Sequence, residues 1–422
     1  MRWRHLPTRR QVLPAWCSHL LRPRTMKTTQ LLLLPILLTR VSSQCLSEDD
    51  ALAPPPHPSL SQVAPFSLDL FGKVLPPSGN FLFSPFSVWS ALVLAYFGSR
   101  GDTKAQMERV LRLPAKEETL ALYRALKQIY APSADGQKHT MLSSNRIYID
   151  TSLPVRRCVQ QVLPDEVKTL NFAQPDLAAA TINHFVNAST QGKIPRLVTT
   201  ADVTLARLAF VNAVYFKGFW ETPFAAENTR REEFFLSPKR RAYVDMMEQT
   251  DNFKNGASEE LDADVVELPY RGGAASMVVL LPRDRGTGGE LDRMLQRLTP
   301  AALASAVGNL ARNKVLLKFP KFKLESSLRN ELIEALTHLG LRDLFSPAAD
   351  LTAFSPSGGL MITHAVHKAV IEVDEKGTEA AAATVFLSKQ SGTYFTCNRP
   401  FLFFIRDNAV NSILFLGVYR EP

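Results

Sequence analysis

Cysteine is scarce in this sequence, which excludes a fold held together by a disulfide framework. The chain has 422 residues but only four cysteines, and their spacing matches no zinc-binding motif. Cys17 lies in a leader that we expect to be removed, so Cys45, Cys158 and Cys397 remain, and three thiols cannot all pair. We therefore expect the fold to rest on a hydrophobic core, in keeping with a hydrophobic content of 45%.

The motifs that mark common enzyme active sites are also absent. We find no G-x-S-x-G, no P-loop, no dinucleotide fingerprint and no H-E-x-x-H. His364 and His367 are three residues apart on a predicted strand, so they face opposite sides and are interpreted as ordinary strand histidines. Gly286–Glu290 lacks the lysine of a phosphate loop and is predicted to be a turn. We therefore expect no enzyme, cofactor or metal site; an enzyme with an unrecognised site is the alternative of another class.

Acidic residues are missing from the first 43 positions, and this asymmetry accounts for the net charge of +9. That segment holds eight of the 49 Lys and Arg residues, so 41 remain against 40 Asp and Glu. A balanced charge gives no reason to expect nucleic-acid binding. The short basic clusters Lys239–Arg241 and Arg156–Arg157 are interpreted as solvated surface.

The sequence contains no apolar run of the ~20 residues that a membrane span requires. The run Leu31–Leu38 is far shorter, and it lies between Met26 and a stretch of small residues. This layout predicts a secretory signal peptide over 26–43, cleaved after Ser43, behind a basic N-terminal extension over 1–25. We expect a secreted, extracellular protein that does not bind membranes. An intracellular fate is the alternative, because the extension moves the signal away from the N-terminus.

Two surface features bear on modification and partners. Asn187-Ala188-Ser189 is the one N-glycosylation sequon, which suits a secreted glycoprotein. A glycosaminoglycan is a candidate partner on the basis of Arg124 and Lys127 alone, within the helix-forming stretch Ala121–Tyr130.

The remaining sequence mixes helical and strand patterns and predicts an α+β fold. Residues 44–61 are Pro-rich and are expected to form a flexible lead-in to one domain over 62–422. Ser84 and Pro85 begin a buried helix that ends at Gly98, and Thr103 with Gln106 has the spacing of a capping box. A second helix is predicted from Leu328 to Gly340. The long apolar run Leu205–Gly218 predicts a central strand covered on both faces. Further strands are predicted, many close in sequence and so expected to be antiparallel, in DVVELPY, ASMVVLLP, KVLLKFPKFKLE, AVHKAVIEV, PFLFFIRD and SILFLGVY.

Several stretches together resemble the serpin family, over about 85% of the chain from residue 62 to its end. The most specific is NAVYFKGFWETPF (Asn212–Phe224), which is followed by Thr229, Phe234 and VDMM at the family's spacing. The others are Asn80 with SPFSVWSAL, Gly98 with GDTKAQM, Asn183 with TQGKIP, FPKFKLE, ADLTAFS, HKAVIEVDEKGTEAAAAT and NRPFLFFIRD.

The resemblance implies a single serpin-like domain with a large central, mostly antiparallel β-sheet, further sheets, surrounding helices and an exposed reactive loop over about 376–396. It also implies a monomeric suicide inhibitor of serine endopeptidases. The target attacks the loop and forms an acyl-enzyme, and the cut loop then inserts into the central sheet. A non-inhibitory serpin (a ligand carrier, chaperone or storage protein) is the alternative.

The start of this loop is suited to rapid insertion. Gly377 lacks a Cβ and allows the chain to pivot, and alternate residues of an inserted strand share one face. The residues that would enter first between parting strands are small, whereas burying an unpaired charge there costs several kcal/mol. We predict that the loop hinge comprises Glu375, Gly377, Thr378, Glu379, Ala380, Ala381, Ala382, Ala383 and Thr384.

Two candidates remain for the reactive bond. Counting forward from Gly377 at the family's interval gives Ser391-Gly392, and a small serine suits the primary pocket of an elastase-like or broad-specificity protease. Counting backward from Pro400 gives a position near Lys389-Gln390, which would attract a trypsin-like protease. Register favours Ser391.

Overall fold

The computed structural model describes residues 46, 52, 53, 55, 58–130, 139–376 and 393–422. All of them belong to one compact unit, Ser43–Pro422. Across these ranges, no helix combines the length and the apolar character needed to cross a bilayer.

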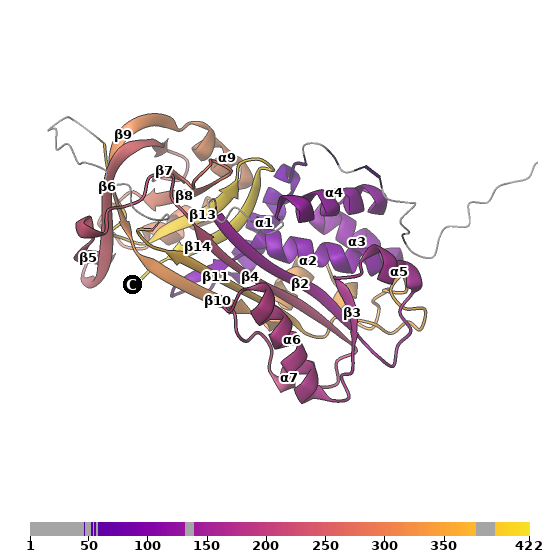
Figure 1. The fold of residues 1–422 in the computed structure, drawn as a ribbon. Helices are drawn as coiled ribbons and strands as arrows, with labels where there is room; N and C mark the ends of the chain where they lie inside the picture. The colour runs from indigo at the N-terminus through magenta and orange to yellow at the C-terminus, as the bar shows by residue number, and fades with distance from the viewer. Residues whose placement is uncertain (1–45, 47–51, 54, 56–57, 131–138, 377–392) are drawn as a thin grey trace, which may run out of the picture. The chain divides into compact units, whose positions relative to one another are not determined.

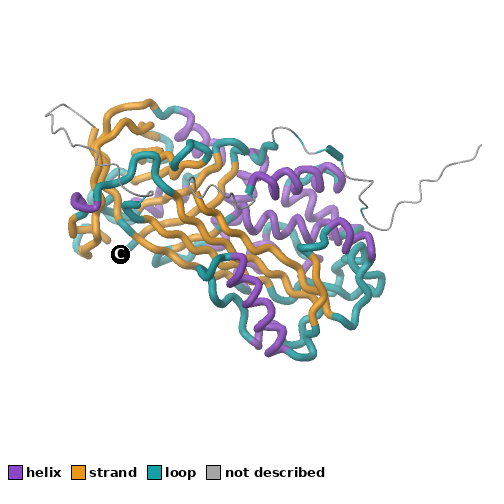
Figure 2. The backbone as a smooth tube through the Cα atoms, in the orientation of Figure 1, coloured by secondary structure: helices purple, strands orange, loops and turns teal. Residues whose placement is uncertain are grey.

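Helices and strands are both present and fall largely in runs along the described chain, as the α+β prediction requires (Figure 2). The α-helices are α1 (Ala64–Val74), α2 (Pro85–Gly98), α3 (Gly101–Leu111), α4 (Lys116–Ile129), α5 (Arg157–Val162), α6 (Pro175–Ser189), α7 (Thr200–Val203), α8 (Glu290–Gln296), α9 (Pro300–Gly308) and α10 (Asn330–His338). Short 3-10 helices are η2 (Ser61–Val63), η3 (Ala226–Asn228) and η4 (Asp343–Phe345).

Two sheets organise the strands. The five-stranded sheet has the order β10 (Phe322–Leu328), β11 (Ala365–Val373), β4 (Leu208–Gly218), β2 (His139–Asp150) and β3 (Val167–Leu170). The nine-stranded sheet has the order β1 (Phe81–Phe83), β14 (Ser412–Tyr419), β13 (Phe401–Asp407), β8 (Ala275–Pro282), β7 (Ala263–Pro269), β6 (Arg240–Ser258), β9 (Ala311–Pro320) and β12 (Thr393–Thr396), with β5 (Arg230–Ser237) beside β6.

The five-stranded sheet is mixed, whereas we predicted a mostly antiparallel one. The pairs β10·β11 and β2·β4 are antiparallel, but β4·β11 and β2·β3 are parallel. Strands joined by a tight hairpin must pair antiparallel, but β4 and β11 are joined only through a long stretch of the chain, which permits a parallel pair.

Helices cover both faces of this sheet. Ile182 and Val186 of α6 join a cluster with Val211 and Tyr215 of β4 on one face, and Figure 1 shows α6 beside β2. On the other face, alternate β4 residues such as Phe216 join the larger core. Because both faces are covered, β4 is buried along almost its whole length, as its apolar run predicts.

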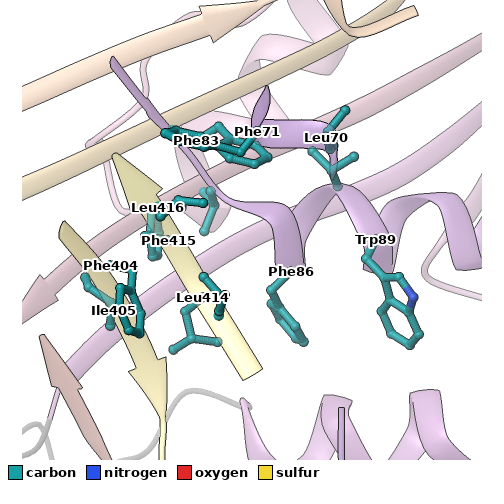
Figure 3. Packing of buried hydrophobic residues seen from close by; sticks show 14 of the residues in the cluster. Leu70, Phe71, Phe83, Phe86, Trp89, Phe404, Ile405, Leu414, Phe415 and Leu416 are labelled. Carbon is teal, nitrogen blue, oxygen red and sulfur yellow. The ribbon is translucent and has the colours of Figure 1, made fainter. Parts of the chain in front are cut away.

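The larger core lies where α1 and α2 pack against the nine-stranded sheet. Figure 3 shows the rings of Phe71 and Phe83 stacked near Leu416 and Phe415 of β14. Every residue of α2 is buried, which agrees with its apolar character all round. Ser84 is its N-cap, as predicted, since the Ser84 hydroxyl accepts the N–H of Ser87 at 3.0 Å.

Four local predictions were wrong. The capping box at Thr103 does not form, because α3 begins at Gly101. Leu205 lies outside β4, with a φ of 59° and 92% exposure. The helix predicted from Leu328 begins two residues later, since Leu328 still belongs to β10. Leu60, at the end of the predicted flexible lead-in, is fully buried and its N–H bonds the carbonyl of Val410.

Candidate functional site

A parallel strand pair lies at the centre of the five-stranded sheet. Residues 210–217 of β4 and 365–372 of β11 pair in register, from Phe210 with Ala365 to Lys217 with Glu372. We call these paired residues the seam. A chain that leaves β11 at its end and turns back would run antiparallel to both strands. Inserted between them, it would replace one parallel ladder with two antiparallel ladders, the slightly more stable arrangement.

His367 lies in the middle of the seam and is buried, not an ordinary strand histidine as predicted. Its Nε2 accepts the N–H of Ser84 at 3.1 Å, so Nδ1 carries the proton and donates it to Oδ1 of Asn212. The Asn212 amide donates to the carbonyl of Ser87 at 3.0 Å and to Asn145 Oδ1. Burial lowers the pKa of His367 to about 3, so the ring is neutral. His364, by contrast, precedes β11. Its ring nitrogen Nδ1 hydrogen-bonds the hydroxyl of the neighbouring Thr363.

Charged side chains close one end of the seam. The carboxylate of Glu372 lies 3.6 Å from the ammonium of Lys217, 3.7 Å from Lys193 and 3.3 Å from Lys323. The hydroxyl of Tyr215 donates to it at 3.1 Å. Burial alone would raise the pKa of Glu372, but these hydrogen bonds and charges outweigh burial and lower it. Because Lys217 belongs to β4 and Glu372 to β11, their contact must break when the seam opens.

The chain beyond β11 is held before the predicted reactive loop begins. Asp374 forms an ion pair with Lys217 at 2.9 Å, and its carbonyl accepts the indole N–H of Trp220 at 2.9 Å. The Asp374 side chain also accepts the N–H of Lys376 at 3.0 Å. These bonds hold the exit from β11 against the end of β4.

Glu375, the one predicted hinge residue that the structure describes, anchors the loop to two other segments. Its carboxylate accepts the hydroxyl of Thr229 at 2.9 Å and pairs with Lys321 at 2.9 Å. Burial would raise the pKa of Glu375, but the hydrogen bonds from Lys321 and Thr229 outweigh burial and lower it.

The other end of the loop is held by the nine-stranded sheet. Residues 393–396, which we predicted as loop, form β12 and pair in parallel with β9, so the loop is shorter at this end than predicted. The N–H of Cys397 donates to the carbonyl of Lys318 at 2.9 Å, and Asn398 accepts the N–H of Phe235 at 2.8 Å. The thiol of Cys397 is free and buried, and burial raises its pKa.

The remaining predicted loop residues lie outside the described residues. They comprise the other hinge positions and both candidate bonds: Gly377, Thr378, Glu379, Ala380, Ala381, Ala382, Ala383, Thr384, Lys389, Gln390, Ser391 and Gly392. What the structure brings together is the frame around them, namely the seam, Glu375 at one anchor and β12 at the other.

The other singled-out residues are scattered over the surface. Asn187 is exposed in the last turn of α6. Lys127 of α4 pairs with Glu166 at 2.5 Å, which neutralises one of the two cations that suggested a glycosaminoglycan. Gly286 and Gly288 have positive φ and belong to a turn, as predicted. Within the ranges that the structure describes, no group of three or more His, Cys, Asp or Glu residues could hold a metal ion.

Sequence reasoning missed the network around His367 and the lysines around Glu372. Asn212, Ser84 and Ser87 were all inside quoted motifs, yet no spacing links them to position 367. A signal did exist: Asn212 is a polar residue within the longest apolar strand, and a buried polar group requires partners.

The comparisons with known proteins agree with this geometry. Residues 61–422 match the family model described as Serpin (serine protease inhibitor). The leukocyte elastase inhibitor of Bos taurus is 38% identical over 375 residues, covering 85% of this chain and 97% of the relative. Ipis-1 of Ixodes persulcatus is 33% identical over 373 residues, covering 84% of this chain and 97% of Ipis-1.

Solved structures show the same fold. Uncleaved ovalbumin superposes with a TM-score of 0.77 at 27% identity, covering 86% of this chain and 99% of ovalbumin. Serpin48 of the insect Tenebrio molitor superposes with a TM-score of 0.73 at 31% identity, covering 85% of this chain and 97% of Serpin48. With a family model that matches nearly the whole described chain and relatives of this identity, the protein is a member of the serpin family of serine protease inhibitors.

Proposed function

We propose that this protein is a suicide-substrate inhibitor of serine endopeptidases. The target cleaves the loop between Lys376 and Thr393 and is held as an acyl-enzyme while the cut loop inserts between β4 and β11. The observation that carries this proposal is the parallel seam, at one end of which the loop begins. The alternative, a non-inhibitory serpin, requires no insertion.

Direction and length both support insertion. The loop leaves the end of β11, so a reversed segment is antiparallel to both strands of the seam. The seam spans residues 365–372 of β11. The part of the loop from Gly377 to Ser391 is longer than this and can cover it when extended.

The seam also supplies the barrier that keeps the intact form from inserting its own loop. Opening it separates Asn212 from His367 and Lys217 from Glu372. Insertion competes with hydrolysis of the acyl bond, and each ~1.4 kcal/mol added to the insertion barrier slows insertion about tenfold. Small residues at the hinge therefore favour trapping over release.

The direct test is a complex with a serine protease that survives boiling in SDS. We would screen trypsin-, chymotrypsin- and elastase-like proteases with the full chain. Thr378→Arg provides the matched control, since a charge at the hinge should convert the inhibitor into a cleaved substrate without unfolding it. An unchanged stoichiometry of inhibition in Thr378→Arg would contradict insertion, and turnover without any covalent complex would favour the alternative.

For the reactive bond we propose Ser391-Gly392, with Lys389-Gln390 as the alternative. Relatives named leukocyte elastase inhibitors favour a small residue, because an elastase has a small primary pocket. The position of β12 favours the alternative, since only Gly392 would separate Ser391 from a paired strand. Mass spectrometry of the released C-terminal peptide decides between a first residue of Gly392 and one of Gln390.

We also propose that the protein is secreted after cleavage behind Ser43 and carries a glycan on Asn187. The exposure of Asn187 supports a glycan. Cys158 is disulfide-bonded, which is typical of oxidising compartments. Expression in animal cells tests this: the medium should contain a chain that starts at Gln44 and loses mass on treatment with an N-glycosidase, and Asn187→Gln should remove that loss. Retention of the uncleaved chain inside the cells would contradict secretion.

A further inference from the structure

Strand β5 lies between the two ends of the reactive loop. Thr229, the residue before β5, donates its hydroxyl to Glu375 at one end of the loop. Phe235, near the end of β5, donates its N–H to Asn398, which follows the loop at the other end. The segment that contains β5 therefore contacts the chain at both ends of the loop, and its partner β6 lies beside it in Figure 1.

The outer face of this β5–β6 hairpin carries two arginines and two exposed aromatic residues. Phe234 and Val244 point inward and are buried, whereas Phe235 is 37% exposed and Tyr243 is 55% exposed. Their neighbours on the outer face pair across the two strands in register. We call the following six residues the hairpin face: Arg231, Glu233 and Phe235 of β5, and Arg241, Tyr243 and Asp245 of β6.

The side chains of the hairpin face hold one another in place. The guanidinium of Arg231 lies 5.8 Å from the ring centre of Tyr243, and that of Arg241 lies 5.6 Å from the ring centre of Phe235. Arg241 also forms an ion pair with Glu233 at 3.0 Å. Such cation–π and cross-strand contacts order the side chains before a partner arrives, which lowers the entropy cost of binding.

The charge of the hairpin is not balanced internally. Glu232 is engaged by Lys318 at 2.5 Å and Glu233 by Arg241 at 3.0 Å. Arg231, Lys239 and Arg240 form no ion pair with any residue that the structure describes, although Asp245 is the register partner of Arg231. The hairpin thus presents more free cations than anions, and a complementary partner surface carries carboxylates.

We propose that the hairpin face, together with the turn at Lys239 and Arg240, is a second docking surface for the target protease. While the protease active site holds the loop, an acidic patch beside its active-site cleft contacts the hairpin. This inference rests on the proposed function and deepens it, because it selects among proteases whose pockets accept the same loop. Arginine and tyrosine are the residue types that dominate binding energy in protein interfaces. A sulfated polysaccharide would use the cations but not the exposed rings.

The test compares two arginine variants of the full chain with the protease that the wild type inhibits fastest. Arg231→Glu changes the hairpin face, and Arg157→Glu makes the same charge change at an exposed position on α5. We expect Arg231→Glu to lower the second-order rate constant of inhibition about tenfold at low ionic strength and less at about 0.15 M, because salt screens exposed charges. Arg157→Glu should stay within about twofold of the wild type, since it lies outside the docking surface. The stoichiometry of inhibition should not change in either variant.

A binding measurement separates this inference from the proposed function. The same protease with its nucleophilic serine replaced by alanine binds the loop without cleavage or insertion, and Tyr243→Ala should weaken that binding several-fold relative to the wild type. If no SDS-stable complex forms but this loss is seen, the docking surface stands and the inhibitory mechanism fails.

Three outcomes overturn the docking surface. They are equal rate constants for Arg231→Glu and the wild type, an equal fall in Arg157→Glu, and unchanged binding of the inactive protease by Tyr243→Ala. Loss of retention on a heparin column by Arg231→Glu with an unchanged inhibition rate would assign the hairpin to a polyanion and also contradict the proposal.

Discussion

Asn212 of β4 and His367 of β11 are register partners across the parallel seam, and their side chains hydrogen-bond to each other. The pair joins the two strands that must separate before a cut loop can enter. Because Nε2 of the same imidazole accepts the N–H of Ser84 at the start of α2, the network also ties the seam to the buried helix.

Replacing His367 by alanine should loosen the seam. The change leaves the Ser84 N–H and the Asn212 carbonyl without their partner, at a cost of about 1–3 kcal/mol each when buried. We expect a lower free energy of unfolding and faster conversion to a form that no longer inhibits, measured by denaturant titration and by activity during incubation at 37 °C. His364→Ala, outside β11, is the control and should behave as the wild type. If the inhibitory form of all three proteins persists equally long at 37 °C, His367 does not hold the two strands of the seam together.

The seam should also weaken in acid because of His367. Burial lowers the pKa of this ring to about 3 in the folded protein, against about 6.5 in the unfolded chain. The unfolded state therefore binds the proton first as the pH falls. The contribution of the neutral His367 ring to the free energy of unfolding is complete above pH 6.5. As the pH falls from there to about pH 3, this contribution decreases by about 1.4 kcal/mol per pH unit. Denaturant titrations of the wild type and of His367→Gln between pH 7 and pH 4 should converge as the pH falls, and parallel curves would show that another group is responsible.

The ion pair between Lys321 and Glu375 should hold the start of the loop. Its oxygen and nitrogen atoms lie 2.9 Å apart, and the Glu375 side chain is only 11% exposed, whereas that of Lys321 is 44% exposed. A double-mutant cycle with Lys321→Met and Glu375→Gln should give a coupling energy of about 0.5–1 kcal/mol, since the lysine remains partly solvated. Thermal unfolding at low and high salt measures it. A coupling energy of zero at both salt concentrations would show that Thr229 alone holds Glu375.

Cutting the loop should make the protein more stable. An inserted strand gains ladder hydrogen bonds along both sides of the seam, each worth about 1 kcal/mol net, so we expect the melting temperature to rise by about 10 °C or more. The measurement is a thermal melt before and after limited proteolysis. Thr378→Arg is the matched control, because the nicked variant should insert poorly and show a smaller rise. If the cleaved wild type has the same melting temperature as the intact protein, the result would favour the non-inhibitory alternative.

Local sequence patterns predicted some helix boundaries and not others. Ser84 caps α2 as expected, because the hydroxyl and the N–H that it accepts are three residues apart in the chain. Thr103 and Gln106 have the same local signature, but Thr103 accepts the N–H of Asp350 and Gln106 accepts that of Arg342. Distant backbone groups therefore use these side chains, and no local rule detects such a partner.

The candidate site divides in the same way. The hinge and the loop could be predicted from the sequence because their requirements, small side chains and a glycine pivot, are properties of consecutive residues. The lysines around Glu372 come from three separate segments, so their meeting depends on how β4, β10 and the chain after α6 are placed. The same is true of the hairpin face, since the exposure of Phe235 and Tyr243 depends on which side of β5 and β6 is covered.

The sequence by itself determined the buried helix α2 and the strands β4, β7, β8, β11, β13 and β14, because hydrophobic periodicity and capping act over a few residues. It also identified the family, through motifs that are each contiguous. Only the tertiary structure decided that β4 and β11 pair in parallel and that His367 bridges them. Pairing between strands so far apart in sequence depends on the packing of the whole domain, which no short stretch of residues encodes.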